Sequence, residues 1–231
     1  MTLDFATVEL YGCIFRGNNA YYGSALYNSS DANMRIINCL FYEQEGSMGS
    51  VYNRSAVSDL EIINCTFAKN KNTVSDIYVN DGAAVIKNTI ISDNVAANSL
   101  TVANGAVMLS NNVFDAITSG NITENTSFLL VQALFTDTAA LDFSLTSNSQ
   151  AINAGTSDGT PQFDITGNPR IGAPDIGAFE YYGDLSVDIL DNANTIIDTN
   201  ICFGQSILIN GKEYGTTGSY SDTITTYSGH D

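Results

Sequence analysis

Hydrophobic and polar residues alternate in short runs that recur along the first half of the chain. The runs IINCLF at 36–41 and IINCTF at 62–67 differ at one position, and YGCIF at 11–15 is a looser copy. Side chains two positions apart share one face of a strand, so Cys and Phe point the same way in each run. Each run therefore predicts a short strand that places these two side chains in a core. The predicted core ladder consists of Cys13, Cys39, Cys65, Phe15, Phe41 and Phe67, and each type recurs every 26 residues.

Two further sets of residues recur at nearly the same interval. They are Tyr27, Tyr52 and Tyr78 in one set, and Asn18, Gln44, Asn70 and Asn94 in the other. A unit of about 23–26 residues with several strands is too small to bury its own apolar face, so successive units must stack. Stacked strands pair in parallel about 4.8 Å apart, and parallel crossovers are nearly always right-handed. The pattern predicts an all-β, right-handed parallel β-helix, a solenoid of about five or more coils.

The composition agrees with a β-rich chain and limits its partners. Eight Lys and Arg against 25 Asp and Glu give the 231 residues a formal charge of −17. Because this charge repels phosphate backbones, nucleic acid is not an expected partner. No apolar run reaches the roughly 18 residues of a membrane span. The first residues, MTLDFATVEL, lack the basic and apolar regions of a signal peptide, so we expect a fragment whose export signal lies upstream.

The cysteines show neither a disulfide framework nor a metal-binding pattern. Stacked Cα atoms about 4.8 Å apart are within disulfide range, but three cysteines in register leave one unpaired. A zinc site needs convergent ligands at short spacings such as CxxC, and none occurs. We interpret the three repeated cysteines as buried thiols that act as small hydrophobes, and we expect no cofactor other than the calcium considered below.

Several motifs resemble those of bacterial β-helix surface proteins. FRGN (15–18), FAKN (67–70), GSALYN (23–28) and GSVYN (49–53) resemble the FxxN and GGAI repeats of polymorphic outer-membrane-type proteins. The stretch at 130–156 and the following 164–181, which ends in DIGAFEY, resemble the end of right-handed β-helix surface proteins of the pectate-lyase-like superfamily. The resemblance covers roughly residues 8–183 and implies an extracellular or cell-surface protein, common in Bacteroidetes-like bacteria. Many such proteins have no established catalytic activity, whereas others in the wider superfamily cleave polysaccharides.

The tail at 201–231 resembles part of a β-rich repeat found in large secreted proteins of the same bacteria. The matching residues are Cys202, Gly211, Tyr214, Gly218, Tyr220, Asp222 and Thr223, whereas His230 stands where the repeat ends in cysteine. We therefore expect three parts: parallel coils at 1–119, the last coils and a C-terminal cap at 120–183, and a linker with a truncated β-rich module at 184–231. This division implies that further domains of a longer parent chain are partners.

The densest group of chemically active side chains falls between positions 158 and 180. The glycines and prolines among them suggest a tight, buried turn structure in which Arg170 pairs with Asp164 or Asp175. A β-helix needs such a cap because its last coil exposes an apolar cross-section and unpaired strand edges. The same carboxylates leave a calcium site and a glycosidase pair open as alternatives. The group consists of Asp158, Asp164, Arg170, Asp175 and Glu180.

A second candidate site is suggested by the resemblance to polysaccharide lyases, which usually need a basic residue and acids that hold calcium. The best such patch is Lys69 and Lys71 next to Asp76 and Asp81, although exposed turn lysines are more often simply solvated. His230 is the only histidine, so no Ser–His–Asp or Cys–His arrangement can be assembled.

Two functions follow from these observations. The first is a non-catalytic structural or adhesive segment of a large secreted or surface protein, which contacts glycans or cell-surface ligands. The alternative is a polysaccharide lyase or glycoside hydrolase of the pectate-lyase-like β-helix type. Convergent carboxylates or a lysine–calcium constellation on one flank of the coils would indicate the enzyme. Polar ladders with aromatic platforms and no convergent charges would indicate the adhesin.

Overall fold

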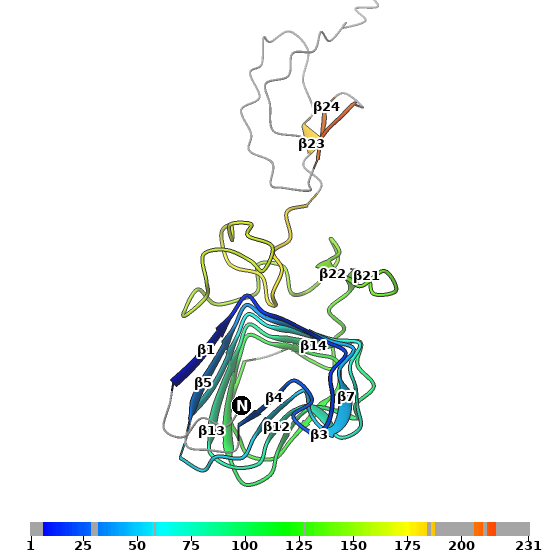
Figure 1. Ribbon diagram of the computed structural model, residues 1–231. Helices are drawn as coiled ribbons and strands as arrows, with labels where there is room; N and C mark the ends of the chain where they lie inside the picture. Colours follow the sequence, from blue (N-terminus) through cyan, green and yellow to red (C-terminus); the bar gives the residue numbers. More distant parts are fainter. Residues whose placement is uncertain are drawn as a thin grey trace, which may run out of the picture. The chain divides into compact units, whose positions relative to one another are not determined.

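The structure is a computed structural model in which the described residues form strands, turns and loops. It describes residues 7–28, 32–57, 59–126, 128–183, 186–187, 206–209 and 212–215. The chain divides into two compact units, Met1–Tyr181 and Tyr182–Asp231. The first unit is a parallel β-solenoid of about four turns, seen nearly along its axis in Figure 1.

Four parallel sheets form the sides of the solenoid, and each takes one strand from successive coils. The first sheet contains, in order, β1 (Thr7–Tyr11), β5 (Asn33–Ile37), β9 (Asp59–Ile63), β13 (Ala83–Lys87), β16 (Ala106–Ser110) and β19 (Ile122–Asn125). The second contains β2 (Ile14–Arg16), β6 (Leu40–Tyr42), β10 (Thr66–Ala68), β14 (Ile90–Ser92), β17 (Val113–Phe114) and β20 (Phe128–Leu129). The third contains β3 (Asn19–Tyr22), β7 (Glu45–Met48) and β11 (Lys71–Asn72). The fourth contains β4 (Leu26–Asn28), β8 (Val51–Asn53), β12 (Ser75–Val79), β15 (Asn98–Val102) and β18 (Ile117–Ser119).

These sheets confirm the prediction of an all-β parallel solenoid. The registers pair like residues of successive coils, as with Phe15, Phe41 and Phe67 in the second sheet. The handedness of the coil and the count of five or more coils stay predictions. No helix among the described residues is long and apolar enough to cross a membrane.

The core is a stack of like side chains along the coil axis. The ring centroids of Phe15 and Phe41 are 4.7 Å apart, those of Phe41 and Phe67 are 4.4 Å apart, and both pairs are nearly parallel. Phe41 and Phe67 are fully buried, whereas Phe15 in the first coil is only partly buried. Stacked aromatic pairs add about 0.5–1.5 kcal/mol each beyond the burial of their surface.

The repeated cysteines form hydrogen-bonded rungs between coils as well as packing in the core. The sulfur of Cys39 accepts the backbone N–H of Cys13, and the sulfur of Cys65 accepts that of Cys39, each at 3.4 Å. In the next coils the same role passes to Thr89 and Asn112, whose side-chain oxygens accept the N–H groups of Cys65 and Thr89. Besides packing as small hydrophobes, Cys39 and Cys65 therefore accept hydrogen bonds that connect successive coils.

Asparagines form the corner between the first and second sheets. Backbone φ is positive at Asn38, Asn64, Asn88 and Asn111, with values of 57°, 48°, 46° and 52°, and Gly12 occupies the same corner in the first coil. Asn enters this left-handed region more readily than other residues with a side chain. The corner therefore directs a column of amide groups outward along the solenoid.

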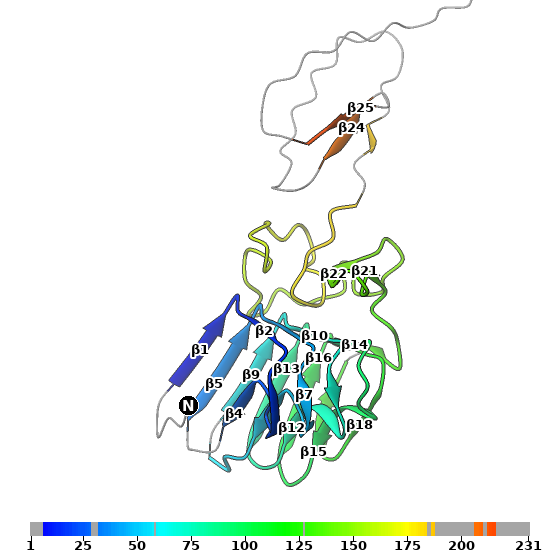
Figure 2. The same cartoon turned by 45° about the vertical axis from the view of Figure 1, so that its right-hand side comes forward.

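Residues 133–181, which we call the covering segment, pack on the outer face of the second sheet. Figures 1 and 2 show this segment lying along the edge of the coils beside β14. It includes the antiparallel hairpin β21 (Phe135–Asp137) and β22 (Asp142–Leu145). Phe143 packs with Leu40 and Ala68, and Ile176 packs in a cluster with Ile90 and Val113. The strands β6, β10, β14 and β17 of the second sheet are thus largely buried on both faces, whereas Ile14 and Arg16 of β2 are exposed. The predicted cap over the last coil is not confirmed by these contacts.

The second unit is described only in part. Three short strands form one sheet: β23 (Ser186–Val187), β24 (Ile207–Ile209) and β25 (Lys212–Tyr214). Tyr214 is the one described residue of the predicted module motif, and it is buried. The remaining motif positions lie outside the described residues: Cys202, Gly211, Gly218, Tyr220, Asp222, Thr223 and His230.

Candidate functional site

The predicted cap residues converge on a buried ion pair in the covering segment. The guanidinium of Arg170 donates to Oε2 of Glu180 at 3.0 Å, and their side chains are only 4% and 2% exposed. Arg170 also donates to Oδ1 of Asn38 at 3.1 Å and to the backbone oxygens of Asp175 and Gly177. The partner of Arg170 is therefore Glu180, not the Asp164 or Asp175 side chain that the sequence suggested.

The carboxylates of this region accept hydrogen bonds from backbone N–H groups. Glu180 accepts from Ile171 and Asp175, each at 3.0 Å. Oδ1 of Asp164 closes the turn that contains Gly167 by accepting from Thr166 and Asn168, and its Oδ2 accepts from the backbone of Glu180. These side-chain bonds add to the few backbone bonds of the region, which include an antiparallel bridge between Phe163 and Pro169.

Asp175 is the third carboxylate of this buried group. It accepts from the backbone N–H groups of Asn153 and Tyr181. Burial raises the pKa of Asp175 to about 6, while these two hydrogen bonds pull the pKa down. The geometry favours the ionised form near neutral pH, because both oxygens act as acceptors.

The corner asparagines attach the covering segment to successive coils. Asn38 donates to the backbone oxygen of Phe163, and Asn64 donates to those of Asp175 and Gly177. Two further contacts extend the series: Asn88 donates to the backbone oxygen of Thr156 at 2.7 Å, and Asn111 to that of Ala154 at 2.9 Å. The covering segment thus runs along the coil axis and is bonded at each corner that it passes.

Asp158 does not belong to the buried group. Its side chain is 78% exposed and forms an ion pair with Lys87 at 2.5 Å. The hydrogen bond from the Lys87 ammonium lowers the pKa of Asp158. Asp158 therefore links the covering segment to β13 at the surface.

The geometry does not fit a calcium site. Calcium needs six to eight oxygen ligands that point inward, and the buried oxygens of Asp164, Asp175 and Glu180 point at N–H donors instead. Among the described residues, no group of three or more His, Cys, Asp or Glu side chains could hold a metal ion. The same hydrogen bonds occupy the buried oxygens of these carboxylates.

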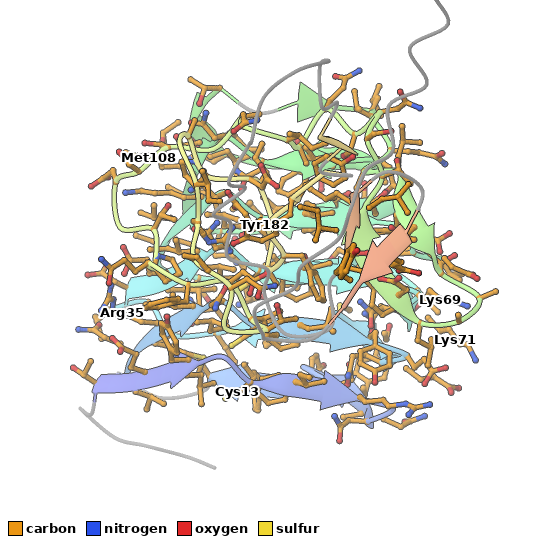
Figure 3. All side chains as sticks on the ribbon, turned by 90° about the horizontal axis from the view of Figure 1, so that it is seen from above. Cys13, Arg35, Lys69, Lys71, Met108 and Tyr182 are labelled. Atoms are coloured by element: carbon orange, nitrogen blue, oxygen red, sulfur yellow. The ribbon has the colours of Figure 1, made fainter. Side chains whose placement is uncertain are left out.

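The lysine patch is not assembled as a site. Figure 3 shows Lys69 and Lys71 at one side of the molecule, with Arg35 and Met108 at the other. The ammonium of Lys69 donates to the backbone oxygen of Thr138 at 2.8 Å, and Lys71 is exposed on β11. Neither lysine forms an ion pair with a described carboxylate within 4.0 Å.

The two acids of that patch have different surroundings. Asp81 accepts a hydrogen bond from its neighbour Asn80. Asp76 is 1% exposed, and its Oδ1 accepts from Asn72 at 3.1 Å while Oδ2 has no hydrogen-bond partner. Burial raises the pKa of Asp76 to about 7. Asp76 is therefore an interior carboxyl group and not a surface ligand for calcium.

The outer face of the fourth sheet carries a row of hydroxyl groups that the sequence did not identify as a site. The strand registers align its members, and we call them the hydroxyl row: Tyr27, Tyr52, Tyr78, Thr101 and Ser119. The ring centroids of Tyr52 lie 5.3 Å from Tyr27 and 5.2 Å from Tyr78. The recurrence of the three tyrosines was visible in the sequence, but only the alternation with core residues on the same strands shows that they point outward.

Comparison of the chain with protein-family models and with the curated proteins finds no match.

Proposed function

We propose that the chain is a non-catalytic structural and adhesive segment of a large secreted or cell-surface bacterial protein, which contacts glycans or other surface ligands. One observation supports this proposal above others: the three carboxylates of the buried group, Asp164, Asp175 and Glu180, accept hydrogen bonds from backbone N–H groups. A general acid or base must reach a proton on its substrate, and these groups are buried and already bonded. A partner would therefore bind the outer faces of the solenoid sheets.

The finer features of the proposal rest on the resemblance and on the repeat pattern. They include a right-handed coil of five or more turns, a cap made by the end of the first unit, and a β-rich module in the second unit. The buried Arg170–Glu180 pair supports a structural role for the DIGAFEY stretch, because it ties that stretch to the corner of a preceding coil.

A turnover assay distinguishes this function from the alternative, a polysaccharide lyase or glycoside hydrolase. The full chain is incubated with pectin, alginate and chondroitin-type polymers, with and without added calcium, and new reducing ends and unsaturated uronates are measured. We expect no products above the background of heat-denatured protein. Product formation that is lost in Lys69→Ala or Lys71→Ala would overturn the proposal.

A further inference from the structure

The four sides of the solenoid differ in what they present to a partner. The covering segment occupies the second sheet, and the first sheet carries a charged ladder in which Arg35 bridges Glu9 and Glu61 at 2.6 and 2.5 Å. The third sheet pairs Lys71 with Glu45 in register, and both are exposed. The fourth sheet differs, because the five aligned outward positions of the hydroxyl row carry no ionic side chain.

The aromatic half of the row is held in place before any ligand binds. Tyr52 is 5% exposed and has ring contacts with Tyr22, Tyr27 and Tyr78 at centroid distances of 5.1 to 5.3 Å. Tyr22 is 47% exposed and extends the cluster to the third sheet, where its ring meets Tyr21 edge to face. Fixed aromatic side chains lose little conformational entropy on binding, so they are efficient contact residues.

The remaining members of the row, Thr101 and Ser119, carry hydroxyl groups on aliphatic side chains. The hydroxyls of Ser119 and Thr101 lie 3.5 Å apart. Because each member sits in the next coil, the row runs along the coil axis with the strand spacing of about 4.8 Å. A linear polymer of repeating polar units that lies along this axis would meet the partly exposed members of the row, Tyr27, Tyr78, Thr101 and Ser119, while Tyr52 is buried between its tyrosine neighbours.

The charge of the chain restricts the chemistry of such a polymer. The formal charge of −17 repels polyanions, and no member of the row carries an ionic side chain. Sugar hydroxyls exchange hydrogen bonds with Tyr, Thr and Ser side chains, and their C–H faces pack on aromatic groups. An uncharged polysaccharide matches both properties of the surface.

We infer that the hydroxyl row on the outer face of the fourth sheet binds an uncharged polysaccharide whose chain runs along the solenoid axis. This inference rests on the proposed adhesive function and names its ligand class and its surface. Figure 2 shows β12, β15 and β18 on the side of the coils away from residues 133–181, so the covering segment leaves this face open.

The test compares the full chain with a variant that loses hydroxyl groups but keeps the shape of the surface. Tyr27→Phe, Tyr78→Phe and Thr101→Val are combined, because each change removes one oxygen from the row without removing its carbon frame. Tyr11→Phe is the matched control, since Tyr11 is 50% exposed on the first sheet and outside the row. Affinity electrophoresis is run in gels that contain a mixed-linkage β-glucan, a xylan, a mannan, pectin or alginate.

We expect at least one of the three neutral polymers to retard the wild-type chain. The combined variant should bind that polymer at least tenfold more weakly, and the Tyr11→Phe chain should bind like the wild type. Equal binding by the combined variant, retardation by pectin or alginate alone, or no retardation by any polymer would overturn the inference. These results leave the proposed non-catalytic function standing, whereas lysine-dependent product formation in the turnover assay overturns that function whatever the gels show.

Discussion

The guanidinium of Arg170 donates a hydrogen bond to Oδ1 of Asn38 at 3.1 Å, although the two residues are 132 positions apart in the sequence. Asn38 lies at a corner of the solenoid with positive φ, and Arg170 carries the buried ion pair of the covering segment. The contact therefore joins the repeating part of the first unit to its non-repeating part.

Replacing Arg170 with alanine should lower the free energy of unfolding by about 3–5 kcal/mol, because Glu180 would remain buried without its partner. Urea denaturation followed by far-ultraviolet circular dichroism measures the change. Arg35→Ala is the control, since Arg35 is 41% exposed in its ion pairs and its loss should cost no more than about 1 kcal/mol. Equal losses in the two variants would contradict the structural role of the Arg170–Glu180 pair.

The rung formed by Cys39 predicts a difference between two substitutions of the same shape. Threonine can accept the Cys13 N–H, as Thr89 does for Cys65, whereas valine leaves that donor unpaired. We expect the free energy of unfolding of Cys39→Thr to exceed that of Cys39→Val by about 1–2 kcal/mol. Identical urea midpoints for the two variants would show that the sulfur contributes packing alone.

Asn64 combines a left-handed backbone with two side-chain bonds to the covering segment, and two substitutions separate these effects. Glycine accepts the left-handed backbone conformation but loses the hydrogen bonds to Asp175 and Gly177. Alanine loses the same hydrogen bonds and is also strained in that backbone conformation. Alanine should therefore be less stable than glycine by about 1–2 kcal/mol, the cost of a left-handed residue with a Cβ. Thermal unfolding of the three chains measures this order, and an alanine variant as stable as glycine would refute it.

Asp76 should make the stability of the chain depend on pH. Its pKa is raised from 3.8 to about 7 in the folded state, so the folded chain holds this proton more tightly than the unfolded chain. The resulting stability is fully present below about pH 4 and is lost as pH rises through about 7. Three units of pKa correspond to roughly 4 kcal/mol, at 1.36 kcal/mol per unit.

Asp76→Asn should remove this dependence, because an amide keeps the acceptor for Asn72 and does not ionise. Urea midpoints of the wild type and the variant are measured from pH 4 to pH 8. The urea midpoint of Asp76→Asn should rise relative to that of the wild type as the pH increases. Parallel curves over the whole range would mean that the Asp76 carboxyl does not titrate in this interval.

The solenoid could be predicted from the sequence because its coils repeat the same contacts. Cys39 and Phe41 recur as Cys65 and Phe67 after 26 residues, and parallel stacking follows directly from that period. The covering segment contains no sequence repeat, so its path over the coils could not be predicted from a repeat interval. It depends on the outward amide of Asn64, and the recurrence of Asn38 and Asn64 after 26 residues does not indicate which backbone oxygen that amide bonds.

The sequence predicted the members of the candidate site only in part, because it grouped residues by their nearness along the chain. The sequence grouped Asp158 with Arg170 because they are close along the chain, but Asp158 pairs with Lys87, 71 residues earlier. It also grouped Asp76 with Lys71, although Lys71 is exposed on β11 of the third sheet and Asp76 is buried on β12 of the fourth sheet. Nearness in sequence predicts a shared site poorly when a coil turns between the residues.

The covering segment also changes how the first unit should fold. In an ordinary solenoid each coil contacts only its neighbours, so coils can form or melt almost one at a time. Here one late segment is bonded to the corners at Asn38, Asn64, Asn88 and Asn111. Because it is made after those coils, Leu40, Ala68, Ile90 and Val113 have no outer partner until it docks. Docking turns a series of separable steps into one cooperative transition that is completed from the C-terminal side.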